Sequence, residues 1–418
     1  MTTKTIATLS NEGTRSVKNK GVSSEGTSII DKIHAAIRLI ENNMKFVEYD
    51  LLAQNPRRFE ELKKILLKVN KLTNRVVIPV SDESFKSAID RLAMEFSDED
   101  SGEVASYIPK LAEANPKDWA VSICTVNGET HSFGDHTKSF SLQSVSKVFM
   151  YALTYELIGV DKINERIGTE PSGRPFNSMD LDQSNKPFNP MVNAGAIMLT
   201  SLYRPKEEFP DRYRKSVEGI NEFAYPHSTG YDHLVYLSEI ETAHINRAIS
   251  YRMLANKAFA ADVDIEKNLA FYTQNCAMTA TTDVLAVMGA TLANSGVNPI
   301  SKKRVISENC CRDTLTIMST CGLYDYSGEF AFKIGLPAKS GVSGALLIVV
   351  PEVMSIAMYS PKLDTCGNSV RGIKFAEKLV QCFNLHPYEN FTNSLPSNID
   401  PGDAQRQIQE DSQEVPTT

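Results

Sequence analysis

The sequence predicts a mixed α/β fold in which one antiparallel sheet is interrupted by a long helical segment. Three observations lead to this prediction. A β-rich run at 119–126 and a second extended run at 130–133 are joined by a segment with Asn127-Gly128, further extended runs return late in the chain, and residues about 150–320 show mostly helical spacing. Strands from both sides of the helical segment can join one sheet, so the segment is expected to form an inserted helical lobe.

The N-terminal third is predicted to be a small helical domain, at about 29–100. Apolar residues recur there at helical spacing in three stripes, one of which consists of Phe85, Ile89, Leu92 and Phe96. Residues 1–28 are rich in Ser and Thr, and residues 389–418 are polar with several prolines. Both segments are predicted to be disordered, because they contain little apolar surface to bury.

Residues 101–388 are predicted to form one domain, with sheet parts at about 101–140 and 328–388. Its helical lobe is expected at about 141–327. Asn127-Gly128 predicts a type I′ hairpin turn, which needs positive φ at both central residues.

The late part of the sheet is predicted from three extended runs separated by Gly or Pro, at 332–336, 345–350 and 355–359. An amphipathic helix that uses Val370, Ile373 and Phe383 is expected to follow. A site is expected in the cleft between sheet and lobe.

Composition excludes several classes of function. The 418 residues have a formal net charge of -7 and a pI near 5.6, which argues against surfaces for nucleic acids or anionic membranes. No apolar run approaches the roughly 20 residues of a membrane span. The seven cysteines show no CxxC spacing, so neither a zinc site nor a disulfide framework is expected. We expect a cytoplasmic protein without metal or cofactor, with mitochondria as the alternative location.

The segment SFSLQSVSKVFM contains three serines just before Lys147. Residues three apart share a helix face, so Ser144 is expected beside the lysine. Ser146 projects about 100° away, and Ser141 is expected to precede the helix. A serine hydroxyl needs a base to become a nucleophile, and a lysine can act as that base when burial at a helix N-terminus lowers its pKa. The alternative is an N-cap serine followed by an exposed lysine.

Two distant motifs favour the catalytic interpretation. Lys339-Ser340-Gly341 falls where the late strands begin, and Asn193 lies within the helical lobe. A Ser-x-x-Lys helix, a lobe asparagine and a Lys-Ser/Thr-Gly strand occur in this order in serine β-lactamases and penicillin-binding proteins. The predicted fold class is therefore β-lactamase-like, that is, DD-peptidase/transpeptidase-like.

Six motifs together resemble the serine-dependent glutaminases, and they are colinear from about Tyr107 to His386. They are Ser106-Tyr-Ile-Pro-Lys-Leu-Ala112, Leu142-Gln-Ser-Val-Ser-Lys147, Glu170-Pro-Ser-Gly173, Asn189-Pro-Met-Val-Asn-Ala-Gly-Ala196, Cys321-Gly-Leu-Tyr324 and Leu336-Pro-Ala-Lys-Ser-Gly-Val342. The helical region before Tyr107 is similar to the N-terminal domain of the animal-type enzymes. Ankyrin repeats are not expected, because the chain ends soon after the catalytic part.

The resemblance implies hydrolysis of L-glutamine to L-glutamate and ammonia through a γ-glutamyl ester. It implies that Ser144 is the nucleophile and Lys147 its base. Tyr324 would relay protons to the leaving ammonia, with Tyr272 as its neighbour. The backbone N–H groups of Ser144 and Val342 would form the oxyanion hole.

The same resemblance assigns residues to the three polar ends of a free amino acid. Glu239 can pair with the ammonium group. Asn193, Asn246 and Tyr107 can bind the carboxylate, and Gln143 lies beside the nucleophile. Mostly neutral donors suit a site that must keep Lys147 uncharged.

The family assembles through the region that matches about 244–257, so a homodimer or homotetramer is expected, with filaments as a further form. The basic residues there, and Ser178 and Asp180 in the loop 173–182, differ from the animal enzymes, so the sequence does not decide whether phosphate activates this protein. Two alternatives stay open. One is a β-lactamase or D,D-peptidase, which would need export and a Ser-x-Asn motif where this lobe has Val192-Asn193. The other is an inactive scaffold, against which the intact Ser144 and Lys147 argue.

Overall fold

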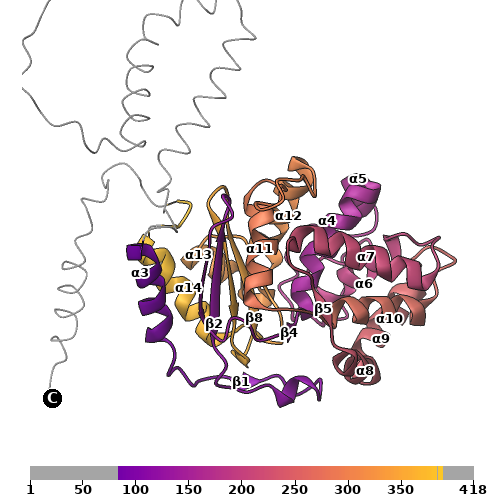
Figure 1. The fold of residues 1–418 in the computed structure, drawn as a ribbon. Coiled ribbons are helices and arrows are strands. Elements are labelled where there is room, and N and C mark those ends of the chain that lie inside the picture. Colours follow the sequence, from indigo (N-terminus) through magenta and orange to yellow (C-terminus); the bar gives the residue numbers. More distant parts are fainter. Residues whose placement is uncertain (1–82, 384, 389–418) are drawn as a thin grey trace, which may run out of the picture. The chain divides into compact units, whose positions relative to one another are not determined.

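The structure, a computed structural model, describes residues 83–383 and 385–388 (Figure 1). The predicted disordered arms at 1–28 and 389–418, and most of the predicted helical domain at 29–100, lie outside the described residues. None of the helices in the described part is both long and apolar enough to cross a membrane.

A five-stranded antiparallel sheet forms the centre of the described region, in the order β3-β2-β9-β8-β7. Its strands are β2 (Ala120–Thr125), β3 (Thr130–Gly134), β7 (Ala338–Ser340), β8 (Ala345–Val350) and β9 (Met354–Tyr359). β2 pairs with β9 along its whole length. Strands from both sides of the helical segment therefore join one sheet, which confirms the predicted topology.

Both faces of the sheet are covered by helices. In β8, Leu347 belongs to the apolar cluster on one face and Leu346 and Ile348 to the cluster on the other, as the two-residue period of a strand requires. Helix α11 (Thr282–Ala293) packs on the lobe side of the sheet. Helices α3 (Glu83–Glu95), α13 (Ser327–Lys333) and α14 (Val370–Phe383) lie on the opposite side (Figure 1).

Helix α3 differs from the prediction that placed its stripe in the N-terminal helical domain. Phe85, Ile89 and Leu92 are buried with the sheet residues. The ring of Phe85 contacts that of Phe383 at 5.3 Å between centroids, and the Trp119 indole N–H donates to the carbonyl of Ala93 at 2.8 Å. An amphipathic stripe predicts a buried helix face, but it does not tell which apolar surface covers that face.

The hairpin between β2 and β3 is present, but the type I′ turn is wrong. Gly128 has a φ of +90°, whereas Asn127 is not among the described residues with positive φ. The Gly128 N–H donates to the carbonyl of Thr125 at 2.9 Å, and the Thr125 N–H donates to the carbonyl of Glu129. This is the longer hairpin loop in which a glycine alone takes the left-handed conformation.

The predicted strand at 332–336 is also wrong, because α13 runs through Lys333 and the edge strand β7 starts only at Ala338. Phe330 and Ile334 are buried, while Phe332 between them is 85% exposed. The apolar spacing is thus helical. Gly335, with a φ of +72°, then reverses the chain before β7.

The lobe contains eight of the described helices besides α11. They are α4 (Ser146–Ile158), α5 (Val160–Asn164), α6 (Asn193–Leu202), α7 (Phe209–Ala224), α8 (His233–Thr242), α9 (His244–Ala255), α10 (Ile265–Cys276) and α12 (Glu308–Cys321). The lobe is not entirely helical, because β4 (Phe140–Ser141), β6 (Met278–Ala280) and β5 (Gly230–Tyr231) form a small sheet. Strands of two or three residues are too short to show a periodic pattern. One more short pair joins β1 (Glu103–Val104) to β10 (Lys362–Leu363).

Candidate active site

Ser144 lies in a 3₁₀ turn, η2 (Gln143–Val145), between β4 and α4. The three serines of the segment have different surroundings. Ser141 ends β4, Ser146 donates its hydroxyl to the carbonyl of Gln143 at 2.7 Å, and Ser144 faces Lys147. Gln143 has a φ of +46°, a strained conformation of the kind found where a backbone presents a functional group.

Lys147 is buried, with 2% of its surface exposed. Its Nζ contacts Ser144 Oγ at 2.7 Å and Asn193 Oδ1 at 2.7 Å. Burial lowers the pKa of Lys147 to about 8, although the charge of Glu239 acts in the opposite direction. A neutral lysine is thus accessible near physiological pH, and in that state the Ser144 hydroxyl donates to the amine.

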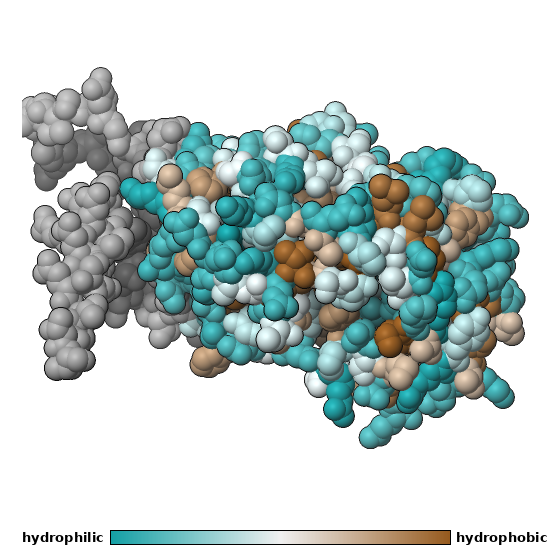
Figure 2. Space-filling view, turned by 90° about the horizontal axis from the view of Figure 1, so that it is seen from below, coloured by the Kyte–Doolittle hydropathy of each residue, from teal (hydrophilic) through white to brown (hydrophobic). Residues whose placement is uncertain are grey.

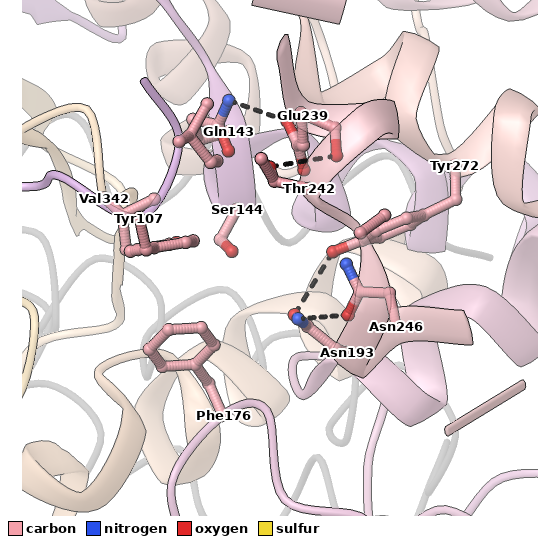
Figure 3. A pocket seen from close by; sticks show the side chains of 12 residues that line it. Tyr107, Gln143, Ser144, Phe176, Asn193, Glu239, Thr242, Asn246, Tyr272 and Val342 are labelled. Atoms are coloured by element: carbon pink, nitrogen blue, oxygen red, sulfur yellow. Dashed lines mark hydrogen bonds between the residues drawn. The ribbon is translucent and has the colours of Figure 1, made fainter. Parts of the chain in front are cut away.

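Asn193 connects three parts of the lobe at the bottom of the site (Figure 3). Its Oδ1 accepts from Lys147 and, at 3.1 Å, from the Tyr272 hydroxyl of α10. Its Nδ2 donates to Asn246 Oδ1 of α9 at 2.9 Å. The asparagine amide therefore orients the lysine, the tyrosine and a second amide at once.

The start of α6 fixes the position of Asn193. Asn189 Oδ1 accepts from the N–H groups of Met191 and Val192 at 3.0 and 3.2 Å, which turns the chain into the helix. A Cβ on Gly195 would stand 1.8 Å from the Asn189 carbonyl oxygen. Only glycine allows this approach without moving the helix.

We expect Gly195→Ala to lower the free energy of unfolding by about 1–3 kcal/mol, as overpacked buried sites do, and to displace Asn193 and reduce activity. The matched control is Gly328→Ala in α13, where an added Cβ meets nothing within 4 Å and helix propensity favours alanine. Denaturant titration and ammonia release check both variants. Equal stability of the two variants would contradict the steric argument.

Glu239 of α8 lines the same cavity as Ser144 and is 6% exposed. Gln143 Nε2 donates to its Oε2 at 3.0 Å. Burial raises the pKa of Glu239 to about 7, while the Gln143 hydrogen bond and the charge of Lys147 act against that rise. A carboxylate with so few donors around it has capacity to bind a cation.

Tyr324 and the edge strand β7 close the site from the sheet side. Tyr324 has a φ of +57°, and its hydroxyl donates to the carbonyl of Ser340 at 3.1 Å and lies beside Ser144. Lys339 is fully buried, with its Nζ 4.3 Å from the centroid of the Tyr324 ring. Burial, and then the charge of Lys147, hold the pKa of Lys339 well below its usual range.

These residues surround a small cavity of about 40 Å³ (Figure 3). Of the predicted site residues, eight line it: Tyr107, Gln143, Ser144, Asn193, Glu239, Asn246, Tyr272 and Val342. The other two predicted residues, Lys147 and Tyr324, do not line the cavity, but both lie next to the Ser144 side chain. The described residues contain no group of three or more His, Cys, Asp or Glu side chains that could hold a metal ion. The structure thus brings the predicted residues together, while their individual roles stay predictions.

Four residues that line the cavity were not predicted: Ile108, Phe176, Thr242 and Ala243. Among these, Phe176 packs on Tyr324 at 4.7 Å between ring centroids, and its carbonyl accepts the Asn193 N–H at 2.9 Å. Cys276, close to the cavity, was not predicted either. The Cys276 thiol interacts with Glu239 and Tyr272. Two features of the sequence could have pointed to these residues. Phe176 lies within the loop 173–182 that was expected to cover the site, and Cys276 is one helical turn after Tyr272.

Comparison with known proteins decides the family. The glutaminase family model matches residues 102–388. The chain belongs to the glutaminase family. It is 46% identical over 340 residues to putative glutaminase 3 of Caenorhabditis elegans, covering 81% of this chain and 58% of that protein. It is 43% identical over 327 residues to the mitochondrial liver isoform of glutaminase from Mus musculus, covering 78% of this chain and 54% of that protein.

The chain spans about half the length of these animal relatives, and it also matches shorter proteins. It is 45% identical over 289 residues to a glutaminase of Nostoc sp., covering 69% of this chain and 85% of that protein. Among solved structures, the probable glutaminase ybaS has a TM-score of 0.70 at 37% identity, covering 74% of this chain and all of that one. Mglu in its glutamate form has a TM-score of 0.69 at 31% identity, covering 75% and 71%. The β-lactamase-like fold class is confirmed.

Proposed function

We propose that this chain hydrolyses L-glutamine to L-glutamate and ammonia through a γ-glutamyl ester on Ser144. The observation that carries this proposal is the 2.7 Å contact between Ser144 Oγ and the buried Lys147 Nζ, at the wall of a cavity that also holds Glu239. A nucleophile with its base, and a buried carboxylate across the cavity, suit a substrate with an amide at one end and an ammonium group at the other.

In the proposed acylation, neutral Lys147 takes the proton of Ser144 as Oγ attacks the side-chain amide carbon. The oxygen of the tetrahedral intermediate then accepts from the backbone N–H groups of Ser144 and Val342. The proton passes from Lys147 through the Tyr324 hydroxyl to the amide nitrogen. The C–N bond breaks, ammonia leaves, and the γ-glutamyl group stays on Oγ as an ester.

In the proposed deacylation, a water molecule attacks the ester carbon and gives its proton to Lys147. The C–O bond to Ser144 breaks as Oγ regains a proton, and glutamate is released. Tyr272 supports both steps by holding Asn193, which in turn holds Lys147. The base is thus regenerated in its neutral form.

Substrate selection follows from the charges in the cavity. Glu239 pairs with the α-ammonium group, and Asn193, Asn246 and Tyr107 donate to the α-carboxylate. Tyr107 is 54% exposed and stands at the opening. The carboxylate meets neutral donors, so no second buried positive charge is added beside Ser144.

We expect Glu239→Gln to raise KM for glutamine by at least about 30-fold, because removing one partner of a buried ion pair costs about 2–5 kcal/mol. The pKa of about 7 adds a pH dependence: below this pH the empty site is protonated, so the wild-type KM rises as pH falls, and the variant loses this trend. Initial rates between about pH 6 and 8 measure both effects. Glu241→Gln, an exposed residue of the same helix, is the control. A KM unchanged in the Glu239 variant would refute its role.

The direct test of the activity is ammonia release from purified protein and glutamine, with and without phosphate. We expect ammonia release, and the comparison of the two conditions shows whether phosphate changes its rate. Hydrolysis of nitrocefin without ammonia release would instead identify a β-lactamase-type hydrolase, and absence of both activities would favour an inactive scaffold.

We also infer that the protein forms a homodimer through α8 and α9. Exposed large apolar residues gather on these two consecutive helices: Leu234, Leu237, Ile245, Tyr251 and Leu254 are 41–58% exposed. Figure 2 views the molecule from below the orientation of Figure 1, the side toward which α8 lies, and apolar residues interrupt the hydrophilic surface of this face. Apolar surface of this kind is typical of contacts between proteins. A homotetramer or filament would need a second contact.

The double variant Leu237→Glu with Ile245→Glu is expected to be monomeric, because two charges would be buried in the contact. Sedimentation velocity measures the change in mass. Phe332→Glu, on α13 and 85% exposed in the wild type, is the control and should leave the assembly intact. A double variant with the assembly state of the wild type would exclude this interface.

For the location in the cell, we propose the cytoplasm, with mitochondria as the alternative. The mouse relative is named as mitochondrial. Fractionation of cells that express the full chain separates the two.

A further inference from the structure

The turn between β10 and α14, residues 364–368, lies against Tyr324 of the active site. Gly367 in this turn has a φ of +91°, and a Cβ on it would stand 3.5 Å from the Tyr324 ring and 3.8 Å from the Phe176 ring. The turn thus adjoins both aromatic side chains, although none of its five residues lines the cavity itself.

Asp364 fixes the shape of this turn. Its Oδ1 accepts from the N–H groups of Cys366 and Asn368 at 2.8 and 2.9 Å, as aspartate side chains often do in turns. Its own N–H donates to the carbonyl of Asn368 at 2.8 Å. Both backbone groups of Asn368 are therefore held, and the whole residue is buried.

The Asn368 side chain binds the edge strand β7. Its Oδ1 accepts from Ser340 Oγ at 2.7 Å. Ser340 ends β7, which pairs with β8 at the edge of the sheet. The Ser340 N–H donates to the Gly322 carbonyl at 3.3 Å, outside the sheet. An edge strand has one side without a strand partner, so the bond to Asn368 helps to fix Ser340 there.

The Ser340 carbonyl connects this support to the active site. It accepts from the Tyr324 hydroxyl at 3.1 Å and from Lys339 Nζ at 2.7 Å. The Tyr324 hydroxyl lies beside Ser144. A shift of Ser340 would therefore move the hydroxyl relative to the bond that breaks, and a misplacement of about 1 Å can lower a rate about 100-fold.

The two ends of the Asn368 amide differ in their partners. Oδ1 is bound by Ser340, whereas Nδ2 is buried and has no hydrogen-bond partner among the described residues. A buried donor without a partner destabilises a fold, and such exceptions are expected at functional positions. The stability of the turn alone thus does not explain an asparagine here, and its oxygen is the part in use.

We propose that Asn368 is a positioning residue that acts on Tyr324 through Ser340. This inference rests on the proposed function, in which the Tyr324 hydroxyl gives a proton to the leaving nitrogen. Asn368 Oδ1 holds Ser340, and the Ser340 carbonyl holds the hydroxyl while the C–N bond breaks and ammonia leaves. Without Asn368 the hydroxyl is misplaced, and the attack by Ser144 is not affected.

A comparison of glutamine with the γ-(S-methyl) thioester of glutamate tests the proposal. The thioester presents the same amino-acid end to the cavity. Its C–S bond breaks with the electron pair on sulfur, so methanethiolate leaves without a proton from Tyr324. Both substrates form the same ester on Ser144. Because kcat/KM covers binding and acylation, the ratio of kcat/KM for glutamine to that for the thioester reports the protonation of the leaving group.

Asn368→Ala is expected to lower this ratio about tenfold or more, as a misplaced proton donor does. Tyr324→Phe removes the hydroxyl and gives the lower limit. Asn368→Ala added to Tyr324→Phe should lower the ratio no further, because both changes act on one step. The matched control is Asn298→Ala. Asn298 is also fully buried, but it donates to the carbonyl of Phe223 and does not line the cavity, so its loss should leave the ratio unchanged.

A second pair of variants covers the case in which Asn368→Ala alone does not fold. Asn368→Ala with Ser340→Ala removes both partners of the bond, which leaves no orphaned hydroxyl. Its ratio should equal that of Ser340→Ala, and both should lie below that of the wild type.

An unchanged ratio in Asn368→Ala, or a further fall when it is added to Tyr324→Phe or Ser340→Ala, would overturn the positioning role. Wild-type protein that hydrolyses neither substrate would instead refute the proposed function, and the inference with it.

Discussion

Ser144→Ala is expected to lower kcat for glutamine by a factor of about 10⁴ or more, the scale seen when a serine nucleophile is removed. The variant should fold as the wild type, because only one oxygen is lost and Lys147 keeps its contact with Asn193. Ammonia release under saturating glutamine measures the effect.

The matched control for this variant is Ser146→Ala. Ser146 is also buried and also belongs to the segment, but its hydroxyl is bound to the Gln143 carbonyl. Activity should stay within a few-fold of the wild type. A Ser146 variant that loses activity while the Ser144 variant keeps it would reverse the choice of nucleophile that helical spacing made.

Lys147→Met is expected to lower kcat by about 10²–10⁴-fold, the usual contribution of a general base. Methionine is unbranched and apolar. Replacing the lysine amine with it removes the free-energy cost of burying a polar group, so we do not expect the loss of the charge to destabilise the variant. Circular dichroism melting controls for folding.

The wild-type pH profile makes the same assignment independently. A base must be neutral, and Lys147 with a pKa of about 8 is neutral above this value. The wild-type kcat should therefore rise with pH through about 8 and then level off. A kcat that falls over this range, or a Lys147→Met variant with the wild-type rate, would exclude the lysine as base.

The sheet was predictable because its signals are local and strong. β2, β8 and β9 each give a continuous β-rich run, and burial along their whole length explains why these runs are so apolar. The edge strand β3 is polar and partly exposed, and the preceding Asn127-Gly128 was its signal. The segment around Lys333 was misread because Phe332 is apolar yet exposed. When Phe332 is counted as a buried residue, the apolar residues at 332, 334 and 336 alternate as in a strand. Because Phe332 is exposed, this alternation does not reflect burial.

The choice of Ser144 was predictable from spacing alone, and the 2.7 Å contact agrees with it. The wider site was predictable only by resemblance, because its residues come from helices far apart in sequence. Cys276 and Phe176 illustrate the limit: both contact site residues, yet a single buried thiol or an aromatic residue in a loop does not differ in sequence from an ordinary core residue.

The covalent ester on Ser144 is the central claim, and peptide mapping by mass spectrometry after acid quench tests it most directly. Wild-type protein mixed with glutamine should carry a γ-glutamyl group on the peptide that contains Ser144, and the group should disappear as glutamine is exhausted. Ser144→Ala protein should carry none. A γ-glutamyl group on another residue, or wild-type turnover by the Ser144→Ala protein, would contradict the account.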